Sequence, residues 1–97
     1  MPSRHRYLFT YDIADDKRRN QVFKTLRDNG DHAQFSVFFC DLNPREFAEL
    51  QGILIRAIDQ RKDQILILDL GTAARDQVLE PTCLGVPYTP PVRVQIV

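Results

Sequence analysis

A single aspartate, Asp12, stands where a segment rich in aromatic and β-branched residues gives way to a basic one. Residues 5–13 alternate along their length in the way that predicts a β-strand, and Asp12 lies near its end. Mg²⁺ commonly takes one or two carboxylates, keeps several waters and accepts phosphate oxygens. An ion held at Asp12 would therefore be able to activate water for phosphodiester cleavage. The alternative is an aspartate that makes a local turn to the backbone at a strand end.

One carboxylate per chain is too few for a well-populated two-metal site. If the strand face that carries Asp12 lies in a homodimer interface, the twofold axis brings two copies of Asp12 together. Two carboxylates so placed repel each other unless they are protonated or bridged by a cation. Any metal chemistry at Asp12 is therefore expected to depend on the dimer.

Positive charge is concentrated in the first part of the chain. The net charge is zero, yet residues 1–27 carry +4 and residues 28–97 carry −4. This asymmetry is compatible with one basic face that meets a polyanion, because phosphate binding responds to local charge. The alternative is a solvated helix face. Arg19 is open to both interpretations, as a phosphate clamp or as a solvated helix residue, and Tyr11 either stacks on a base or packs internally.

Several elements must position these residues. Residues 15–29 have helical spacing, and Gly30 is expected to end that helix in the left-handed conformation. Residues 32–42 alternate as one continuous second strand. Asn43, Pro44 and Glu46 together predict the start of a second helix with a capping box.

The remaining elements are read from apolar runs and prolines. Residues 64–70 are apolar enough to be a central strand. Residues 81–91 contain four prolines and are expected to form an extended arm, and residues 92–97 alternate as one more strand. With a hairpin partner in residues 77–88, the order fits a ferredoxin-like α+β fold, β-α-β-β-α-β, over residues 1–80. Residues 81–97 would then supply the arm and an extra C-terminal strand that completes a sheet of the dimer.

The predicted sheet has helices on one face only. The other face is expected to carry Leu8, Phe38 and Cys40, an apolar surface that would be covered by stacking on a second copy of the chain. The chain has two cysteines, in no metal-binding pattern, and neither a signal peptide nor a long apolar run. These features predict a cytoplasmic protein with free thiols and no membrane partner.

Two motifs resemble those of a known family. Residues 11–19, YDIADDKRR, are similar to the Y-D-I-[ST]-x-[DN]-x-x-R motif of the CRISPR-associated Cas2 family, and residues 34–38, QFSVF, are similar to its Q-[YF]-S-V-F strand. The order and separation of the two motifs match along essentially the whole chain. Three positions depart from the family pattern: Ala14 replaces the usual Ser or Thr, and Gln21 and His32 stand where some members carry arginine.

The resemblance implies a ferredoxin-like homodimer that acts in CRISPR adaptation, the capture of new spacers. Its partners would be the CRISPR integrase (Cas1) and either double-stranded DNA or single-stranded RNA. Asp12 would be the ligand of Mg²⁺, with Tyr11, Arg19 and Phe38 as supporting residues of a catalytic site. The phosphate contacts would come from the basic residues of the first helix, namely Lys17, Arg18, Arg19 and Arg27.

Three functions remain open on the sequence. The first is a nucleic-acid-binding dimer that bridges integrase assemblies and follows a duplex through phosphate contacts. The second is a magnesium-dependent endonuclease centred on paired Asp12 carboxylates. The third is a toxin-like RNA interferase of the same fold, because this fold hosts many functions.

Overall fold

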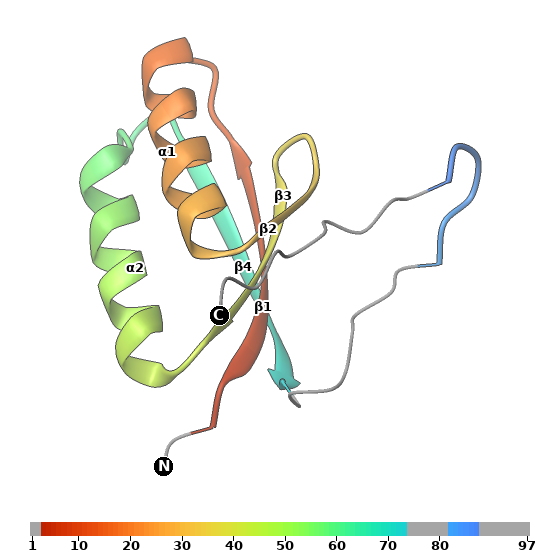
Figure 1. The fold of residues 1–97 in the computed structure, drawn as a ribbon. Coiled ribbons are helices and arrows are strands. Elements are labelled where there is room, and N and C mark those ends of the chain that lie inside the picture. The colour runs from red at the N-terminus through yellow and green to blue at the C-terminus, as the bar shows by residue number, and fades with distance from the viewer. Residues whose placement is uncertain (1–2, 74–81, 88–97) are drawn as a thin grey trace, which may run out of the picture.

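The computed structural model describes residues 3–73 and 82–87. Two helices pack on one face of a four-stranded antiparallel sheet (Figure 1). The elements in chain order are β1 (His5–Asp12), α1 (Asp16–Asn29), β2 (Asp31–Gln34), β3 (Val37–Leu42), α2 (Pro44–Ala57) and β4 (Gln64–Thr72). The strand order is β2-β3-β1-β4. The predicted ferredoxin-like β-α-β-β-α-β layout is confirmed. Within the described ranges no helix is long and apolar enough to cross a membrane.

Both helices begin at a side-chain cap, and the capping box predicted for the second helix is confirmed. The Asp15 side chain accepts a hydrogen bond from the backbone N–H of Arg18 at 2.8 Å. Asn43 accepts from the Glu46 N–H at 2.8 Å, and the Glu46 carboxylate accepts from the Asn43 N–H at 2.9 Å. This reciprocal capping box satisfies amides that the first helical turn leaves without a partner.

Gly30 ends α1 for a different reason from the one predicted. Its φ of −167° is extended backbone, so the expected left-handed conformation is wrong. A Cβ atom at this position would lie 2.4 Å from Cys40 Sγ and 2.4 Å from the Phe39 carbonyl oxygen. Glycine is needed here because α1 turns into β2 directly against β3, where no side chain fits.

The predicted single strand of residues 32–42 is a hairpin. β2 pairs with β3 in antiparallel register, with Asp31 opposite Phe39 and His32 opposite Phe38. The chain reverses at Phe35, whose φ is +36°. The hairpin therefore lies within the second motif. Of residues 77–88, where a hairpin partner was expected, only 82–87 are described, and these form no strand. The turn at Phe35 was missed because no glycine, proline or asparagine interrupts the alternation at this point.

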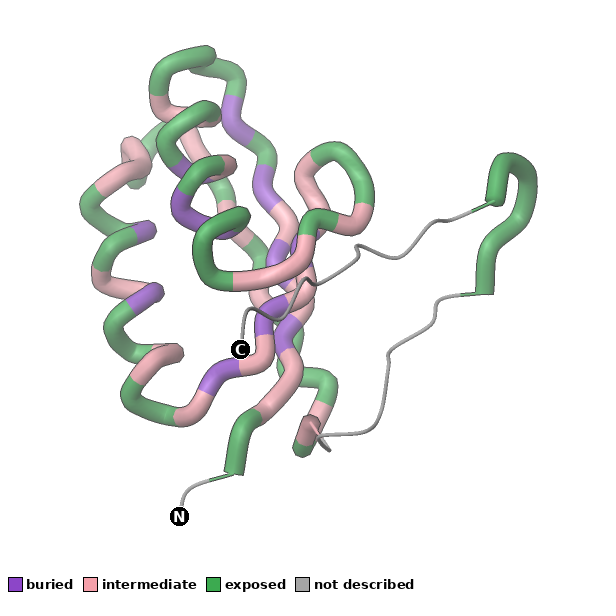
Figure 2. The backbone as a smooth tube through the Cα atoms, in the orientation of Figure 1, coloured by how far each residue is buried: buried purple, intermediate pink, exposed green. Residues whose placement is uncertain are grey.

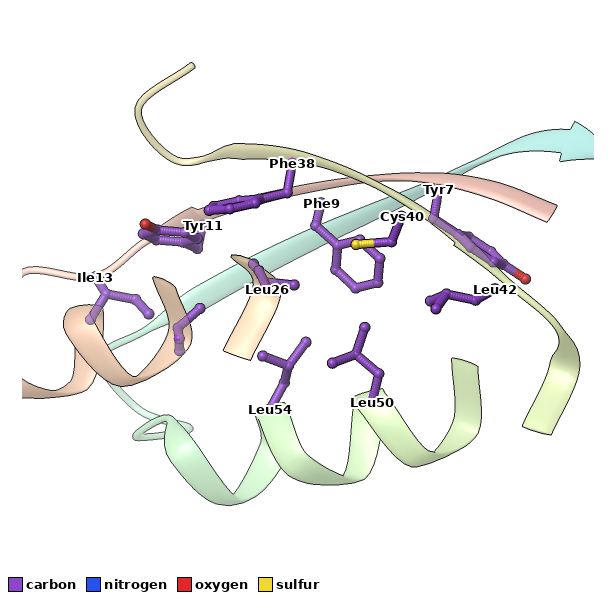
Figure 3. Packing of buried hydrophobic residues seen from close by; sticks show 11 residues of the cluster. Tyr7, Phe9, Tyr11, Ile13, Leu26, Phe38, Cys40, Leu42, Leu50 and Leu54 are labelled. Carbon is purple, nitrogen blue, oxygen red and sulfur yellow. The ribbon is translucent and has the colours of Figure 1, made fainter. Parts of the chain in front are cut away.

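The core lies between the sheet and the two helices, and buried positions recur along both central strands (Figure 2). Phe9, Phe38 and Cys40 are fully buried, and Figure 3 shows Phe9 and Cys40 above Leu50 and Leu54 of α2. The prediction that Phe38 and Cys40 lie on the uncovered face is wrong. Because the side-chain period of a strand is two, an error of one residue in the register exchanges the two faces. Leu8 pairs with Phe39, and Phe38 pairs with Phe9.

The sheet face away from the helices, here called the open face, is nevertheless apolar. Its centre carries apolar side chains and one threonine that alternate with the buried residues: Leu8, Thr10, Val37, Phe39, Leu66 and Leu68. The ion pair of Arg6 and Asp41, at 2.8 Å, lies on the same face toward one end of the two strands, and Asp12 lies at the other end of β1. Leu66 and Leu68 expose 55% and 57% of their surface.

β4 is apolar on both faces, with Ile65 and Ile67 packed against the core. It was expected to be central, but it ends the strand order among the described residues. The predicted strand at residues 92–97 lies outside the described residues, and of the proline-rich arm at 81–91 only residues 82–87 are described.

Candidate metal and nucleic-acid site

Asp12 is the last residue of β1 and lies at the margin of the open face. It is exposed, and it pairs with Gln64 at the start of β4. Its neighbour on the same face, Thr10, pairs with Val37 on one side and Leu66 on the other. Among the described residues the Asp12 carboxylate has no hydrogen bond or ion pair. The local turn to the backbone is therefore not formed there, and both carboxylate oxygens are available for a ligand.

Tyr11 and Phe38 belong to the opposite face of the sheet. Their rings stack with centroids 6.3 Å apart, and Tyr11 retains 8% exposure (Figure 3). Burial raises the pKa of the Tyr11 hydroxyl, against a smaller lowering by the charge of Arg19. The structure therefore shows Tyr11 packed internally and does not bring Phe38 to the Asp12 side of the sheet.

Arg19 holds the loop that follows Asp12. Its Nη1 donates to the carbonyl oxygens of Ile13 and Ala14, each at 3.1 Å. Its Nη2 forms an ion pair with Asp16. Because the guanidinium fixes the backbone one residue after Asp12, Arg19 is a positioning residue for the strand end.

Arg18 is bound to a carboxylate that the sequence did not single out. Its Nε and Nη2 donate to the two oxygens of Asp63, at 2.7 Å and 3.2 Å. The Asp63 side chain is only 1% exposed, and it also accepts from the Asp59 N–H at 2.8 Å. The bond from Arg18 is the main cause of a lowered pKa at Asp63. The partners are 45 residues apart, and no sequence pattern connects them.

Lys17 and Arg27 are the predicted phosphate contacts that point into solvent. Both are exposed, at the first and last turns of α1. The Arg27 guanidinium carbon lies 5.7 Å from the ring centroid of Phe23, and Arg27 is only at the limit of an ion pair with Asp28, at 4.0 Å. Of the four basic residues predicted to meet phosphate, these two have charge that the described structure leaves available.

Each chain offers a metal ion one candidate ligand, the carboxylate of Asp12. In the described part of the chain, no group of three or more His, Cys, Asp or Glu side chains is placed to hold a metal. A carboxylate at a strand end fits Mg²⁺, which accepts one or two such ligands with water and phosphate in the remaining positions. A second Asp12 from another copy of the chain would complete a two-carboxylate site.

Comparisons with known proteins agree on one family. The sequence model for "CRISPR associated protein Cas2" matches residues 5–78. A protein of Rhodospirillum rubrum named "CRISPR-associated endoribonuclease Cas2 1" is 46% identical over 69 residues, which are 71% of this chain and 68% of that protein. The "CRISPR-associated endoribonuclease Cas2 2" of Thermodesulfovibrio yellowstonii is 38% identical over 64 residues, which are 66% of this chain and 70% of that one.

Solved structures give the same result. The structure of Streptococcus pyogenes Cas2 at pH 6.5 superposes with a TM-score of 0.64 and 35% identity, over 68% of this chain and 86% of that one. The hypothetical protein TT1823 of Thermus thermophilus superposes with a TM-score of 0.67 and 32% identity, over 84% of this chain and 96% of that one.

Proposed function

The chain belongs to the CRISPR-associated Cas2 family, and we propose that it is a CRISPR adaptation protein that cleaves single-stranded RNA as a homodimer. The observation that carries the proposal is the position of Asp12. Its carboxylate has no partner among the described residues and lies at the edge of an apolar face that those residues leave uncovered. RNA is preferred to DNA as the substrate because both relatives described above are named endoribonucleases.

A second copy of the chain is the occupant that best fits the open face. The exposed leucines of this face, Leu66 and Leu68, lie at alternate positions of β4 and form part of a contiguous apolar surface, which marks an interaction site. A twofold stack of two such faces is self-complementary and would place the two Asp12 residues near each other. Their mutual repulsion favours a bound cation between them.

Each chain would contribute two groups with distinct roles. Asp12 would hold magnesium, and Arg19 would keep the strand end in place through the carbonyls of Ile13 and Ala14. When bound, magnesium would supply positive charge to the phosphate and an activated water.

The test is cleavage of labelled single-stranded RNA and of duplex DNA with magnesium, by the parent and by Asp12→Asn. Asp28→Asn is the matched control because Asp28 is an exposed aspartate near the end of α1. We expect cleavage of RNA by the parent and the control and none by Asp12→Asn. An Asp12→Asn protein that cleaves as fast as the parent would remove this site from the mechanism.

A second candidate function is a bridge between integrase assemblies on duplex DNA. It is favoured by the lack of a three-ligand metal cluster in the described part of the chain and by the exposed charges of Lys17 and Arg27. The double variant Lys17→Glu/Arg27→Glu should bind duplex DNA more weakly and with a smaller dependence on salt. Arg45→Glu, on the exposed side of α2, is the control. The family match favours these CRISPR roles over a toxin-like RNA interferase of the same fold.

A further inference from the structure

Phe35 is a large aromatic side chain left in solvent at the tip of the β2–β3 hairpin. It exposes 88% of its surface, although Phe9 and Phe38 are fully buried. An isolated exposed apolar residue is ordinary on a protein surface. Phe35 differs from such residues in its backbone conformation and in its position.

The backbone of Phe35 is in a region that bulky residues rarely adopt. Its φ is +36°, and it is the only residue other than glycine with a positive φ in the described part of the chain. Glycine or asparagine would reverse the chain here at lower cost. The conformation is held by His32, whose Nε2 donates to the Phe35 carbonyl oxygen at 2.6 Å. The His32 ring in turn stacks on Phe38, with centroids 4.6 Å apart.

The hairpin tip and Asp12 lie at the same end of the sheet. The last pair between β1 and β3 is Thr10 opposite Val37. Asp12 follows Thr10 on one strand, and Phe35 precedes Val37 on the neighbouring strand, so both lie just beyond that pair. Figure 1 shows the hairpin tip beside the end of β1 that leads into α1.

We propose that Phe35 is a stacking platform for a base of the single-stranded RNA, and that it places the adjoining phosphate at Asp12. The inference rests on the proposed function for its substrate. Proteins recognise single-stranded RNA by stacking splayed bases on aromatic side chains. Such stacking tolerates any base, because every base presents a π-face. A platform on a hairpin held by His32 therefore predicts cleavage with little sequence preference.

The test separates binding from cleavage. The affinity for a fluorescently labelled single-stranded RNA is measured by anisotropy in EDTA, in an Asp12→Asn background, so that the result does not depend on nuclease activity. Phe35→Ala should weaken binding by about 5-fold to 150-fold, the range for loss of one stacked base. Phe35→Trp should bind at least as well as the parent. Ile55→Ala, an exposed apolar residue of α2, should have no effect.

A second measurement excludes an interface role for Phe35. The molar mass in solution, from light scattering, should be the same for Phe35→Ala and the parent. A 2-aminopurine base in the RNA should lose fluorescence on binding to the parent and keep it with Phe35→Ala. Unchanged RNA affinity in Phe35→Ala, or a change in its molar mass, would overturn the proposal. If the parent binds and stacks RNA through Phe35 as expected but does not cleave it, the proposed nuclease activity fails and the role of Phe35 stands.

Discussion

The guanidinium of Arg18 donates two hydrogen bonds to Asp63, at 2.7 Å and 3.2 Å, and so joins the first turn of α1 to the residue that precedes β4. Asp63 is almost completely buried, while Arg18 remains partly exposed. A buried carboxylate that loses its cation keeps the cost of desolvation without the compensating bonds. The pair is therefore a structural contact between elements that are distant in the sequence.

Arg18→Ala should lower the free energy of unfolding. The variant leaves Asp63 with the bond from Asp59 and no guanidinium. Arg45→Ala is the control because Arg45 and Glu49 form an exposed pair within α2, 87% and 61% exposed. Removal of such a pair costs about 0.5 kcal/mol or less. Urea unfolding at neutral pH should show the larger loss for Arg18→Ala, and equal losses would contradict the assigned role.

Stability should fall in acid. Hydrogen bonds from Arg18 hold the pKa of Asp63 below the ordinary value of 3.8, and the Gly71 N–H, followed by His5, does the same for Asp69. Because the unfolded chain binds protons first, this stability is present above pH 3.8 and is lost as the pH falls through the lower, folded-state pKa values. Urea unfolding between pH 6 and pH 2.5 measures the effect. Asp63→Asn should reduce this pH dependence.

Gly30→Ala should destabilise the fold by about 1–3 kcal/mol, the usual cost of overpacking. The added methyl group would meet the Phe39 carbonyl oxygen, which is backbone and cannot move aside as a side chain does. Gly52→Ala is the opposite case. Gly52 lies within α2, and its added Cβ would meet only Arg56 Nη1, at 3.5 Å. Because alanine favours helix, Gly52→Ala should stabilise by about 0.5–1 kcal/mol. Thermal melts that give both variants the same sign would refute this account.

Leu68→Glu should shift the protein from dimer to monomer if the open face is the dimer interface. A charge in the centre of an apolar interface has no partner after water is excluded. Ile55→Glu is a matched control, since the two side chains are 57% and 58% exposed and Ile55 lies on α2. Light scattering over a range of concentrations measures the mass. A dimer that survives Leu68→Glu but not Ile55→Glu would place the interface on the helices.

Patterns of neighbouring residues predicted the helices and most strands of this fold. The face of the sheet on which a strand residue lies depends on the register between strands that are distant in the sequence, and neighbouring residues do not give that register. The capping box at Asn43 and Glu46 and the end of β1 at Asp12 follow from neighbouring residues, so the sequence was sufficient. The turn at Phe35 and Ser36 contains no glycine, proline or asparagine and was missed. Phe38 was misplaced for another reason: its strand was set one residue out of register with the first strand, so Phe38 and not Phe39 was placed on the face of Leu8.

For the candidate site, the sequence singled out Asp12 but not the contacts that the arginines of α1 make. Asp12 was singled out from its place at a strand end, and its role as a metal ligand was inferred from the family resemblance. The structure leaves its carboxylate available among the described residues. The uses of Arg18 and Arg19 were not predictable, since Asp63 is distant in sequence and the carbonyls of residues 13 and 14 have no sequence signature. β4 was predicted as central because it has apolar residues on both faces. That pattern is the same whether the second face is covered by another layer or meets solvent, so it does not determine where the strand lies in the sheet.

A site that draws one carboxylate from each of two chains has a genetic consequence. If the Asp12 residues of two subunits act together, a chain that lacks this carboxylate still folds and still pairs with an intact one. With equal amounts of both chains and random pairing, only about a quarter of the twofold dimers retain both carboxylates. A defective copy of the gene would therefore act dominantly over a normal copy in the same cell.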